Sequence, residues 1–332
     1  MAPHASLMLR EPEADNANEP FLVDVLRGLA QSPKVIPARW FYDDAGSALF
    51  EAITRLPEYY PTRVESGILT QSAGAIAAAV GPCRVVVEFG AGSAAKTPLM
   101  LDAIAPAAYV ALDISGDFLR EACARLQQRY PALPITALEA DFMHPLDLAA
   151  TLPATVKGLP KLGFFPGSTI GNLAPAASVD LLRAMRTTLD EGAMLLIGMD
   201  RVKPAAVLTR AYNDKAGVTA AFNLNLAARI NRELGGTIPL EALRHRAVWN
   251  AELSRIEMHL EATRALSFVV AARAFAMAAG ETIHTENSHK YEPGTATMLL
   301  IAGGWTPVAH FTDADERFMV IVAEAQPPRL EP

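Results

Sequence analysis

Cysteine and positive charge are both scarce in this chain of 332 residues. The two cysteines, Cys83 and Cys123, lack the spacing of a metal site, and we expect them to be reduced thiols in a packed interior. Lys and Arg number 29 against 36 Asp and Glu, which gives a net charge of −7. Because phosphate binding needs a basic face, this balance argues against a nucleic acid as the main partner.

Long apolar runs are absent as well. Two stretches carry no charge, but 66–83 is rich in Ala, Gly, Ser and Gln, and 162–179 is broken by Pro and Gly. Both are too weakly apolar to cross a membrane. The N-terminus lacks the basic region and apolar run of a signal peptide, and residues 1–18 are polar and predicted to be a loose tail. We therefore expect a cytoplasmic monomer with no membrane partner.

The stretch 84–97 organises the rest of the chain. Three successive valines from Val85 are typical of a buried strand, Gly90 and Gly92 allow a sharp turn, and a helical pattern follows over 96–103. Strand, glycine-rich turn and helix form the first unit of a nucleotide-binding α/β fold, in which small residues let backbone N–H groups approach a ligand. A turn with a purely structural role is the alternative.

Glu88 decides how this turn is interpreted. The third glycine of a dinucleotide fingerprint would fall at Ala95, so the match to that motif is weak. An acid two residues before Gly90 disfavours a pyrophosphate and suits a cationic or zwitterionic ligand. S-adenosylmethionine carries a sulfonium and an amino group and no phosphate, and we interpret the loop as its binding site.

Acidic and aromatic residues close the next two predicted strands. Further strands are expected at 108–114, 135–140, 161–166 and 194–199. Asp113 lies where an acid accepts hydrogen bonds from ribose hydroxyls, unless it caps the helix predicted at 116–129, a role that Ser115 also fits. Asp141 and Phe142 suit adenine, the first for its exocyclic amine and the second for its ring.

The loop after the fourth strand, 167–173, is expected to face the reacting group. Ligands of a doubly wound sheet lie beyond the carboxyl ends of its strands. Asn172 offers both a donor and an acceptor in this loop. The alternative is a turn whose glycines and Asn adopt unusual dihedral angles.

The alternation of strands and helices stops after Asp200. A helical pattern covers 203–235, strand-like alternation covers 245–274, and the polar run 281–291 is expected to rejoin the first domain. The remaining predicted elements are helices at 20–32, 63–80 and 295–302 and a hairpin of strands at 307–311 and 318–323. A five-stranded parallel sheet completed by a terminal hairpin is the pattern of class I methyltransferases.

We therefore predict an α/β protein with a Rossmann-like class I methyltransferase sheet and a second α+β domain. The predicted S-adenosylmethionine-binding domain comprises 64–200 and 290–332. The N-terminal segment and an insertion, 19–63 and 201–289, form the predicted substrate-binding lid.

Four ordered motifs resemble the histidine Nα-methyltransferases of ergothioneine biosynthesis in bacteria and fungi. The resemblance runs from about Phe41 to the C-terminus, and its motifs are Tyr42-Asp43 through Gly46-Ser47 with Leu49-Phe50, Leu56-Pro57-Glu58-Tyr59-Tyr60-Pro61-Thr62-Arg63, Gly167-Ser168-Thr169-Ile170-Gly171-Asn172, and Thr285-Glu286 with Ser288. It implies an enzyme that uses S-adenosylmethionine to trimethylate the α-amino group of free histidine, giving hercynine. The glycine loop departs from the family's commoner Gly-Ser-Gly-Thr-Ser-x-Lys and loses two hydroxyls.

Site residues follow from the resemblance, position by position. Expected cofactor contacts are Tyr42, Gly90, Lys96, Asp113, Asp141 and Phe142, and Glu88 and Gly92 are added from the strand and turn described above. Phe50 is added because its ring, with those of Tyr42 and Tyr59, can make cation–π contacts. Expected substrate contacts are Tyr59, Gly167, Asn172, Tyr212, Met258, Glu286 and Ser288. The resemblance implies that Asn172 and Tyr212 bind the substrate carboxylate. It further implies that Glu286 accepts the imidazole N–H, that Ser288 contacts the other ring nitrogen and that Met258 packs on the ring. Asn172, Tyr42 and the Gly167 carbonyl are expected to orient the reacting nitrogen as the catalytic residues, without a dedicated base.

Several alternatives stay open. The substrate can be another amino acid or small amine, and the same kind of sheet also serves nicotinamide-dependent oxidoreductases and non-catalytic sensors of S-adenosylmethionine. Glu286 can be a solvated charge, and Tyr212 can be a brace for its helix. Met258 lies on an alternating strand and can simply pack in the core. His284 and His289 are five residues apart without an evident third ligand, and we expect no metal.

Overall fold

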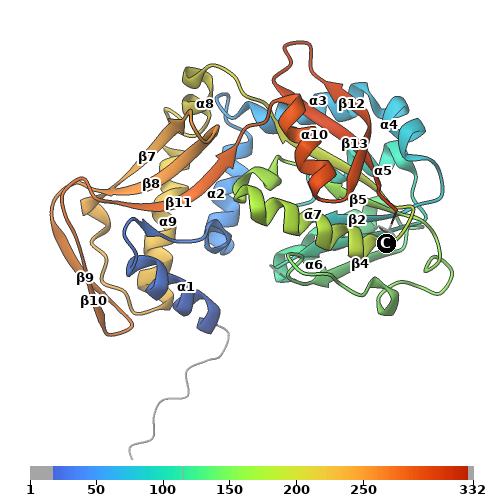
Figure 1. The fold of residues 1–332 in the computed structure, drawn as a ribbon. Coiled ribbons are helices and arrows are strands. Elements are labelled where there is room, and N and C mark those ends of the chain that lie inside the picture. Colours follow the sequence, from blue (N-terminus) through green and yellow to red (C-terminus); the bar gives the residue numbers. More distant parts are fainter. Residues whose placement is uncertain (1–17, 115, 328–332) are drawn as a thin grey trace, which may run out of the picture.

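The computed structural model describes residues 18–114 and 116–327, which form two lobes (Figure 1). The tail predicted at the N-terminus falls almost entirely in residues 1–17, and these lie outside the described residues, as does Ser115. No helix in the described ranges is long and apolar enough to cross a membrane.

The larger lobe is built on a twisted sheet. Among the described residues, seven strands make up this sheet: β2 Val85–Phe89, β3 Ala108–Asp113, β4 Ile135–Glu139, β5 Lys161–Phe165, β6 Met194–Asp200, β12 Trp305–Thr312 and β13 Phe318–Ala325. Their spatial order is β12-β13-β6-β5-β2-β3-β4, with β2 to β6 parallel and β13 antiparallel to both of its neighbours. The three valines that begin β2 are fully buried, as expected of a parallel strand covered on both faces. This order confirms the predicted sheet and its terminal hairpin.

Helices cover both faces of the large sheet. One face packs on α7 Pro175–Leu189 and α10 Pro293–Ala302, and the other on α3 Tyr60–Gln71, α4 Ala73–Val80, α5 Thr97–Ile104 and α6 Gly116–Arg129. The single helix predicted at 63–80 is therefore wrong in one respect. The chain breaks at Ser72, which ends α3 and precedes α4.

The smaller lobe has its own sheet, in the order β1-β11-β8-β7. Its strands are β1 Lys34–Val35, β11 Thr282–His289, β8 Arg255–Ala262 and β7 Leu243–Asn250, and a hairpin of β9 Leu266–Val270 and β10 Arg273–Met277 extends the lobe. Its helices are α1 Glu19–Leu29, α2 Asp44–Thr54, α8 Ala205–Ala211 and α9 Val218–Glu233. The described residues also form the 3₁₀ turns η2 Ala38–Phe41, η3 Leu148–Ala150, η4 Thr169–Asn172 and η5 Leu240–Ala242.

Strand β11 corrects the expectation for the polar run 281–291. The run does not simply rejoin the large lobe, because β11 lies in the small sheet between β1 and β8. Its register with β8 shifts between His284 and Glu286, which marks a bulge. Polar side chains on both faces hid the alternation that would have identified the strand.

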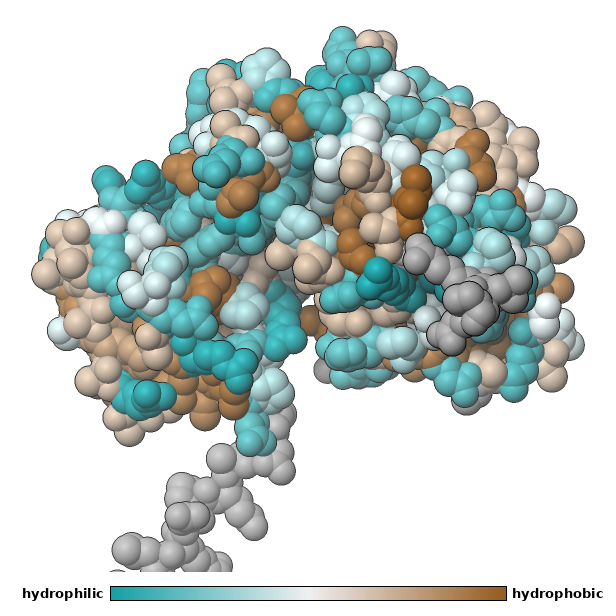
Figure 2. All heavy atoms as spheres, viewed as in Figure 1, coloured by the Kyte–Doolittle hydropathy of each residue, from teal (hydrophilic) through white to brown (hydrophobic). Residues whose placement is uncertain are grey.

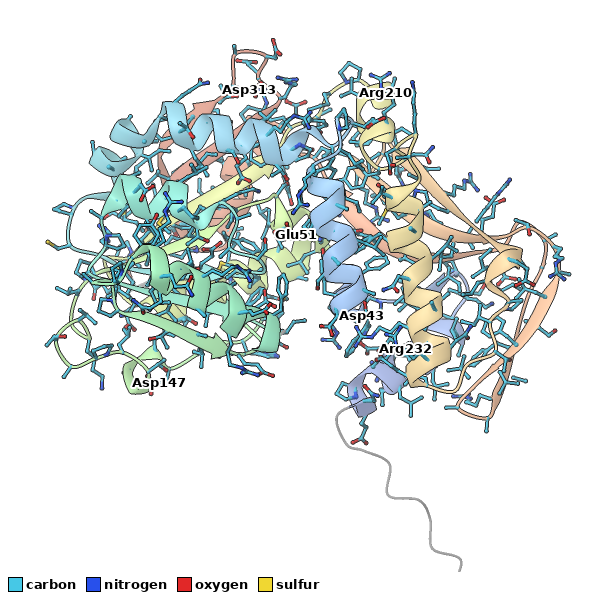
Figure 3. All side chains as sticks on the ribbon, turned by 180° about the vertical axis from the view of Figure 1, so that it is seen from behind. Asp43, Glu51, Asp147, Arg210, Arg232 and Asp313 are labelled. Atoms are coloured by element: carbon cyan, nitrogen blue, oxygen red, sulfur yellow. The ribbon has the colours of Figure 1, made fainter. Side chains whose placement is uncertain are left out.

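The N-terminal segment packs into the small lobe from a great distance in sequence. The rings of Phe41 and Phe222 stack at 4.5 Å between centroids. Asp43 caps α2 by accepting from the Gly46 N–H at 2.7 Å, and it also receives the Asn225 amide at 2.8 Å and pairs with Arg232. Figure 3 shows Asp43 at the start of α2 beside Arg232 of α9. The segment predicted as one part of the lid therefore shares a core with the insertion.

Two glycines provide a test of how tightly this segment packs. A Cβ added at Gly28 of α1 would lie 1.7 Å from the carbonyl oxygen of Val35, whereas one added at Gly67 of α3 meets nothing within 4 Å. Gly28→Ala should lower the free energy of unfolding by about 1–3 kcal/mol. Gly67→Ala should raise it by about 0.5–1 kcal/mol, because alanine restricts the unfolded chain. Denaturant unfolding measures both, and a neutral Gly28→Ala would contradict the close packing of α1 on β1.

Candidate active site

A cavity of about 730 Å³ lies where the two lobes meet. The surface is notched between the lobes in Figure 2. Both lobes contribute to its lining, the large one through the carboxyl ends of its strands and the small one through β11 and α2. The predicted site residues that line it are Tyr42, Phe50, Tyr59, Glu88, Gly90, Gly92, Lys96, Asp113, Asp141, Phe142, Gly167, Asn172, Tyr212, Glu286 and Ser288.

The glycine loop is tied to the end of the neighbouring strand. Gly90 and Gly92 have φ angles of 70° and 51°, a backbone region that residues with a side chain rarely adopt. The Gly92 N–H donates to Asp113 Oδ2 at 2.9 Å, and the Leu112 carbonyl accepts from the Gly90 N–H at 2.9 Å. Asp113 therefore fixes the loop on one side, a contact that sequence reasoning did not identify.

An aromatic floor lies beside this loop. The Phe142 ring meets Phe89 edge-on at 6.0 Å and Phe165 at 6.3 Å. A Cβ at Gly90 would lie 3.5 Å from Phe142 Cζ, so the loop passes close over the ring. Asp141 turns the chain next to it by accepting from the Met143 N–H at 2.9 Å. The predicted adenine site thus has an apolar surface and an acid side by side.

Glu65 joins the cofactor loop to the loop after β5. Its side chain is 1% exposed, it forms an ion pair with Lys96, and each carboxylate oxygen lies 2.9 Å from the Gly167 N–H. Gly198 of β6 makes room for it, because a Cβ there would lie 1.9 Å from Glu65 Oε1. Sequence reasoning missed Glu65. A glycine inside the apolar strand β6 signals that something approaches closely, but it does not say which residue.

Glu88 is held by the large lobe itself. Its Oε2 accepts from the Thr97 hydroxyl at 2.6 Å and from the Tyr109 hydroxyl at 2.8 Å. Burial raises the pKa of Glu88 to about 7, although both hydrogen bonds oppose the shift. A direct contact between Glu88 and a cationic cofactor stays a prediction, since one of its oxygens already serves the fold.

Aromatic rings form one wall of the cavity. Tyr42 meets Phe50 at 5.7 Å, Phe50 meets Tyr59 at 6.4 Å, and Tyr59 meets Tyr212 at 6.0 Å, each edge to face. Burial raises the pKa of Tyr42 well above its ordinary value, with Glu286 adding to the shift. The tyrosines therefore stay neutral and present ring faces and hydroxyl groups.

Glu286 extends from β11 into this cavity. Its carboxylate has no hydrogen bond or ion pair within the described part of the chain. Burial raises the pKa of Glu286 to about 8, and the charge of Lys290 opposes that shift. A carboxyl group in this setting is ready to accept from a ligand N–H.

A buried polar network lies behind Tyr212 and Ser288. The two hydroxyl oxygens are 2.7 Å apart, and Lys290 Nζ lies 3.0 Å from the first and 2.7 Å from the second. Lys290 also pairs with Asp200 at 2.9 Å, and both of these side chains are fully buried. Sequence reasoning identified the two hydroxyls but missed the charged pair behind them.

Asn172 ends η4 and lines the same cavity. The turn is pressed against β11, because a Cβ on Gly171 would lie 2.8 Å from the His289 carbonyl oxygen. Ser168, with φ 58°, begins the turn, and its Oγ accepts from the Asp200 N–H at 2.9 Å. The loop predicted to face the reacting group thus lies between both sheets.

Met258 is the predicted site residue that does not line the cavity in the described structure. Its side chain is 2% exposed and packs in the core of the small lobe. Its carbonyl oxygen accepts from the Thr285 hydroxyl at 3.0 Å. Met258 lies on β8 directly across from Glu286 of β11, so the two side chains share one face of the small sheet. Contact between Met258 and the substrate ring stays a prediction.

One group of side chains in the small lobe has donors that suit a metal. Glu257, His259 and His284 each offer an atom within 4.8 Å of the other two. The Glu257 carboxylate is engaged by Arg255 at 2.6 Å and by Asn250 at 3.0 Å. Both of these partners bind Oε1, and Oε2 lies 3.2 Å from His259 Nε2. In this structure the group therefore forms an ion-pair and hydrogen-bond cluster.

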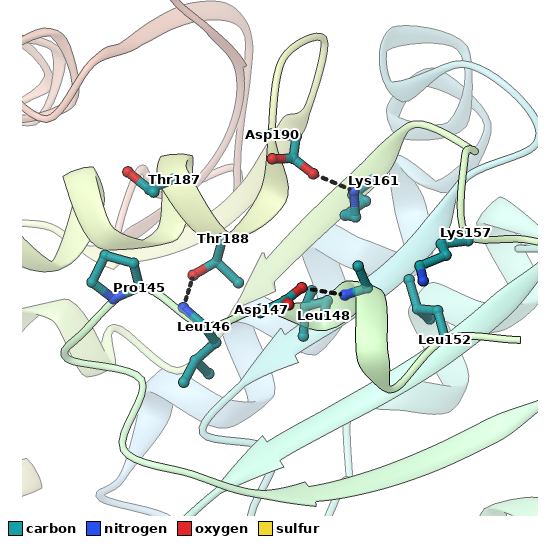
Figure 4. A pocket seen from close by; sticks show the side chains of 11 residues that line it. Pro145, Leu146, Asp147, Leu148, Leu152, Lys157, Lys161, Thr187, Thr188 and Asp190 are labelled. Atoms are coloured by element: carbon teal, nitrogen blue, oxygen red, sulfur yellow. Dashed lines mark hydrogen bonds and ion pairs between the residues drawn. The ribbon is translucent and has the colours of Figure 1, made fainter.

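A smaller cavity of about 350 Å³ lies elsewhere on the large lobe, between 145–152 and the end of α7 (Figure 4). Its Lys161 pairs with Asp190 at 2.9 Å, and Thr188 Oγ1 accepts from the Leu146 N–H at 2.9 Å. None of the predicted site residues lines it.

Comparison with known proteins identifies the family. A model described as histidine-specific methyltransferase, SAM-dependent, matches residues 21–325. The chain belongs to this family. A histidine N-alpha-methyltransferase of Mycolicibacterium smegmatis is 42% identical over 90% of this chain and 93% of that protein. The corresponding protein of Mycobacterium tuberculosis is 40% identical over 87% and 90%, and ergothioneine biosynthesis protein 1 of Neurospora crassa is 28% identical over 89% of this chain and 34% of that protein.

Membership in this family confirms the resemblance seen in the motifs and the predicted dependence on S-adenosylmethionine. It rules out the alternative of a nicotinamide-dependent oxidoreductase. The individual site residues stay predictions, and their convergence on one cavity supports them.

Glu65→Gln tests whether this residue holds the two loops together. The substitution removes the charge that balances Lys96 and turns an acceptor beside the Gly167 N–H into a possible donor. We expect S-adenosylhomocysteine to bind at least about tenfold more weakly in calorimetry, because the partly buried ammonium of Lys96 loses its partner. Glu121→Gln, a change at a side chain that is 76% exposed, is the control and should bind normally. Equal affinity of the natural chain, Glu65→Gln and Glu121→Gln for S-adenosylhomocysteine would show that Glu65 does not support the cofactor site.

The raised pKa of Glu286 predicts a pH-dependent stability. The folded chain keeps this proton up to a pKa of about 8, whereas the ordinary value is 4.5. The unfolded chain therefore binds fewer protons between these values, and the free energy of unfolding falls as pH rises through this window. Glu286→Gln should make the fall shallower by at most about 1.4 kcal/mol per pH unit and leave the part that comes from Glu88, whose pKa is also raised.

Denaturant unfolding of the ligand-free protein at several pH values measures this effect. Glu292→Gln, at an exposed position, should keep the slope of the natural chain. Parallel stability curves for the natural chain and Glu286→Gln would contradict the raised pKa.

Proposed function

We propose that this protein transfers three methyl groups from S-adenosylmethionine to the α-amino nitrogen of L-histidine, giving hercynine for ergothioneine biosynthesis. One observation carries the proposal: Glu286 and Ser288 of β11 share a cavity with the glycine loop and Asn172. A ring-recognition pair and a cofactor loop in one cavity are what the reaction needs. The family and its curated relatives support the same substrate.

The cavity suits S-adenosylmethionine chemically. Asp113 at the carboxyl end of β3 is proposed to bind the ribose. Asp141 and Phe142, just after β4, are proposed to bind adenine. Lys96 is balanced by Glu65, so this part of the cavity does not carry the unpaired positive charge that a phosphate would need. When bound, the cofactor supplies a methyl group on a positively charged sulfur.

The residues around the reacting nitrogen position it and exclude water. An α-amino group has an ordinary pKa near 8, and a neighbouring positive charge lowers it further, so no strong base is required. Asn172, Tyr42 and the Gly167 carbonyl are proposed to orient the lone pair. Alignment of two bound reactants can supply several kcal/mol of the barrier reduction.

Successive transfers require a pocket that accepts a growing cation. The edge-to-face rings of Tyr42, Phe50 and Tyr59 line the cavity and offer cation–π contacts of about 0.5–2 kcal/mol. A quaternary ammonium has no N–H left to donate a hydrogen bond, but a cation–π contact with a neutral ring does not need one. This wall therefore fits a product with three methyl groups.

The proposal includes a monomer that acts on a small molecule in the cytoplasm. The cavity that supports it is formed within a single chain. Size-exclusion chromatography with light scattering tests the oligomeric state.

Incubation with labelled S-adenosylmethionine and the standard amino acids tests the reaction. Mass spectrometry should find histidine carrying three methyl groups as the main product. Glu286→Ala should lower kcat/KM for histidine at least about a hundredfold, because the ring N–H then lacks its buried acceptor. Glu292→Ala, an exposed change three residues past β11, is the control. Label on another amino acid, or normal histidine turnover by Glu286→Ala, would overturn the proposal.

A further inference from the structure

Strand β11 contains one extra residue just before Glu286. Up to His284, which lies opposite His259, it pairs with β8 in one register. From Glu286, which lies opposite Met258, the register is shifted by one. Thr285 is the residue between the two registers and forms a β-bulge. Because side chains alternate between the faces of a strand, the bulge decides which face of the small sheet carries Glu286.

The shifted register directs Glu286 into the cavity. Glu286 shares the face of Met258, which is buried in the core of the small lobe. Burial raises the pKa of Tyr42, and the charge of Glu286 raises it further, which places the carboxylate near this ring. In the register that precedes the bulge, Glu286 would instead lie opposite Glu257, and two carboxylates would face each other on the other side of the sheet.

A buried asparagine of α9 holds the extra residue. The Thr285 hydroxyl donates to Asn223 Oδ1 at 2.7 Å and, at a longer distance of 3.0 Å, to the Met258 carbonyl oxygen. Asn223 Nδ2 donates to the His259 carbonyl oxygen at 3.0 Å. Because that carbonyl can only accept, the amide nitrogen must face it and the amide oxygen must face Thr285. The two side chains belong to residues that are 0% and 1% exposed, so bulk water cannot replace either partner.

The second hydrogen of the Asn223 amide connects the bulge with Tyr212. It is donated to His245 Nδ1 at 2.9 Å, and His245 Nε2 donates to the Tyr212 carbonyl oxygen at 2.8 Å. Burial lowers the pKa of His245, so the ring stays neutral and Nδ1 can accept. One asparagine thus ties the extra residue of β11 to the end of α8 (Figure 1).

The ring of His284 bridges the bulge as well. Its Nε2 donates to the Glu286 carbonyl oxygen at 3.0 Å and so spans Thr285. This bond lies within β11, whereas the bond from Thr285 reaches α9. The contact with Asn223 is therefore the one that fixes the bulge relative to a helix of the small lobe.

We propose that Asn223 is a positioning residue for substrate binding: it holds Thr285 in the bulge of β11 and thereby keeps the Glu286 side chain directed into the cavity. Asn223 does not line the cavity in the described structure, so it acts through β11. The inference rests on the proposed function and deepens it, because it names what orients Glu286.

A double-mutant cycle tests whether Asn223 acts through Glu286. Asn223→Ala and Glu286→Gln are made singly and together, and kcat/KM is measured for the amino acid that the natural chain methylates fastest. Asn223→Ala should lower kcat/KM at least about tenfold in the natural chain but less than about threefold in Glu286→Gln, because the carboxylate to be oriented is then already gone. An equal loss in both backgrounds would overturn the inference.

Two variants of Thr285 assign the effect to its hydroxyl. Thr285→Val keeps the branched shape and removes the hydroxyl, whereas Thr285→Ser keeps the hydroxyl. We expect Thr285→Val to lower kcat/KM at least about tenfold, because Asn223 Oδ1 loses its donor. Thr285→Ser should retain at least about fivefold more of kcat/KM than Thr285→Val. Equal losses in the two variants would show that the hydrogen bond does not position Glu286.

Asn231 provides a matched control on the same helix. Its Nδ2 donates to the Ile238 carbonyl oxygen and its Oδ1 accepts from the Ile238 N–H, both at 2.8 Å. Asn231→Ala should destabilise the fold as Asn223→Ala does, yet keep the natural kcat/KM, because neither Asn231 nor Ile238 lines the cavity in the described structure. All variants should bind S-adenosylhomocysteine normally, which checks the large lobe. If Asn223→Ala does not fold, the two Thr285 variants decide.

The outcomes separate this inference from the proposed function. Methylation of another amino acid in place of histidine overturns the function, and the cycle is then read with that amino acid. Normal histidine turnover with equal losses in both backgrounds overturns only the role of Asn223. If the natural chain methylates no amino acid, a crystal structure of Thr285→Val decides, and an unchanged register of β11 with Glu286 in its place would overturn the inference.

Discussion

The buried ion pair of Asp200 and Lys290 is the contact on which the arrangement of the site depends. Asp200 ends β6 of the large sheet, and Lys290 directly follows β11 of the small sheet. A buried charge is costly unless it is paired and hydrogen-bonded, so the two ends are held to one relative position. Tyr212 and Ser288 are placed by the same ammonium. The substrate side of the cavity is therefore held in a fixed position relative to the end of β6 in the large lobe.

Glu65 fixes the cofactor side of the cavity, as Asp200 fixes the substrate side. It reaches from α3 to the ammonium of Lys96 and the backbone N–H of Gly167. One carboxylate thus links the glycine loop with the turn that leads to Asn172. Both acids are almost fully buried and lie at places where two segments must meet accurately for a methyl group to pass between them. Charge is used here to fix positions, and neutral rings and hydroxyls face the ligand.

Most of the large lobe could be predicted from local patterns. Runs such as Val85–Val87 mark fully buried parallel strands, and the glycines after them mark the turn at which a ligand lies. Other elements left no such pattern. Strand β11 is polar on the cavity face and carries a bulge, so its alternation is broken. The break at Ser72 lies in a stretch of small residues that local propensity does not resolve.

The sequence by itself determined the fold class, the order of the strands and the identity of most residues in the cavity, because hydrophobic periodicity and ordered motifs are local properties of the chain. Only the tertiary structure decided that Glu65, Asp200 and Lys290 belong to the site and that Met258 is buried beside Glu286 without lining the cavity. An acid or a lysine within a chain has the same local signature whether it is solvated or buried. Its role is set by partners that lie far away in sequence, and these meet it only when the two lobes pack together.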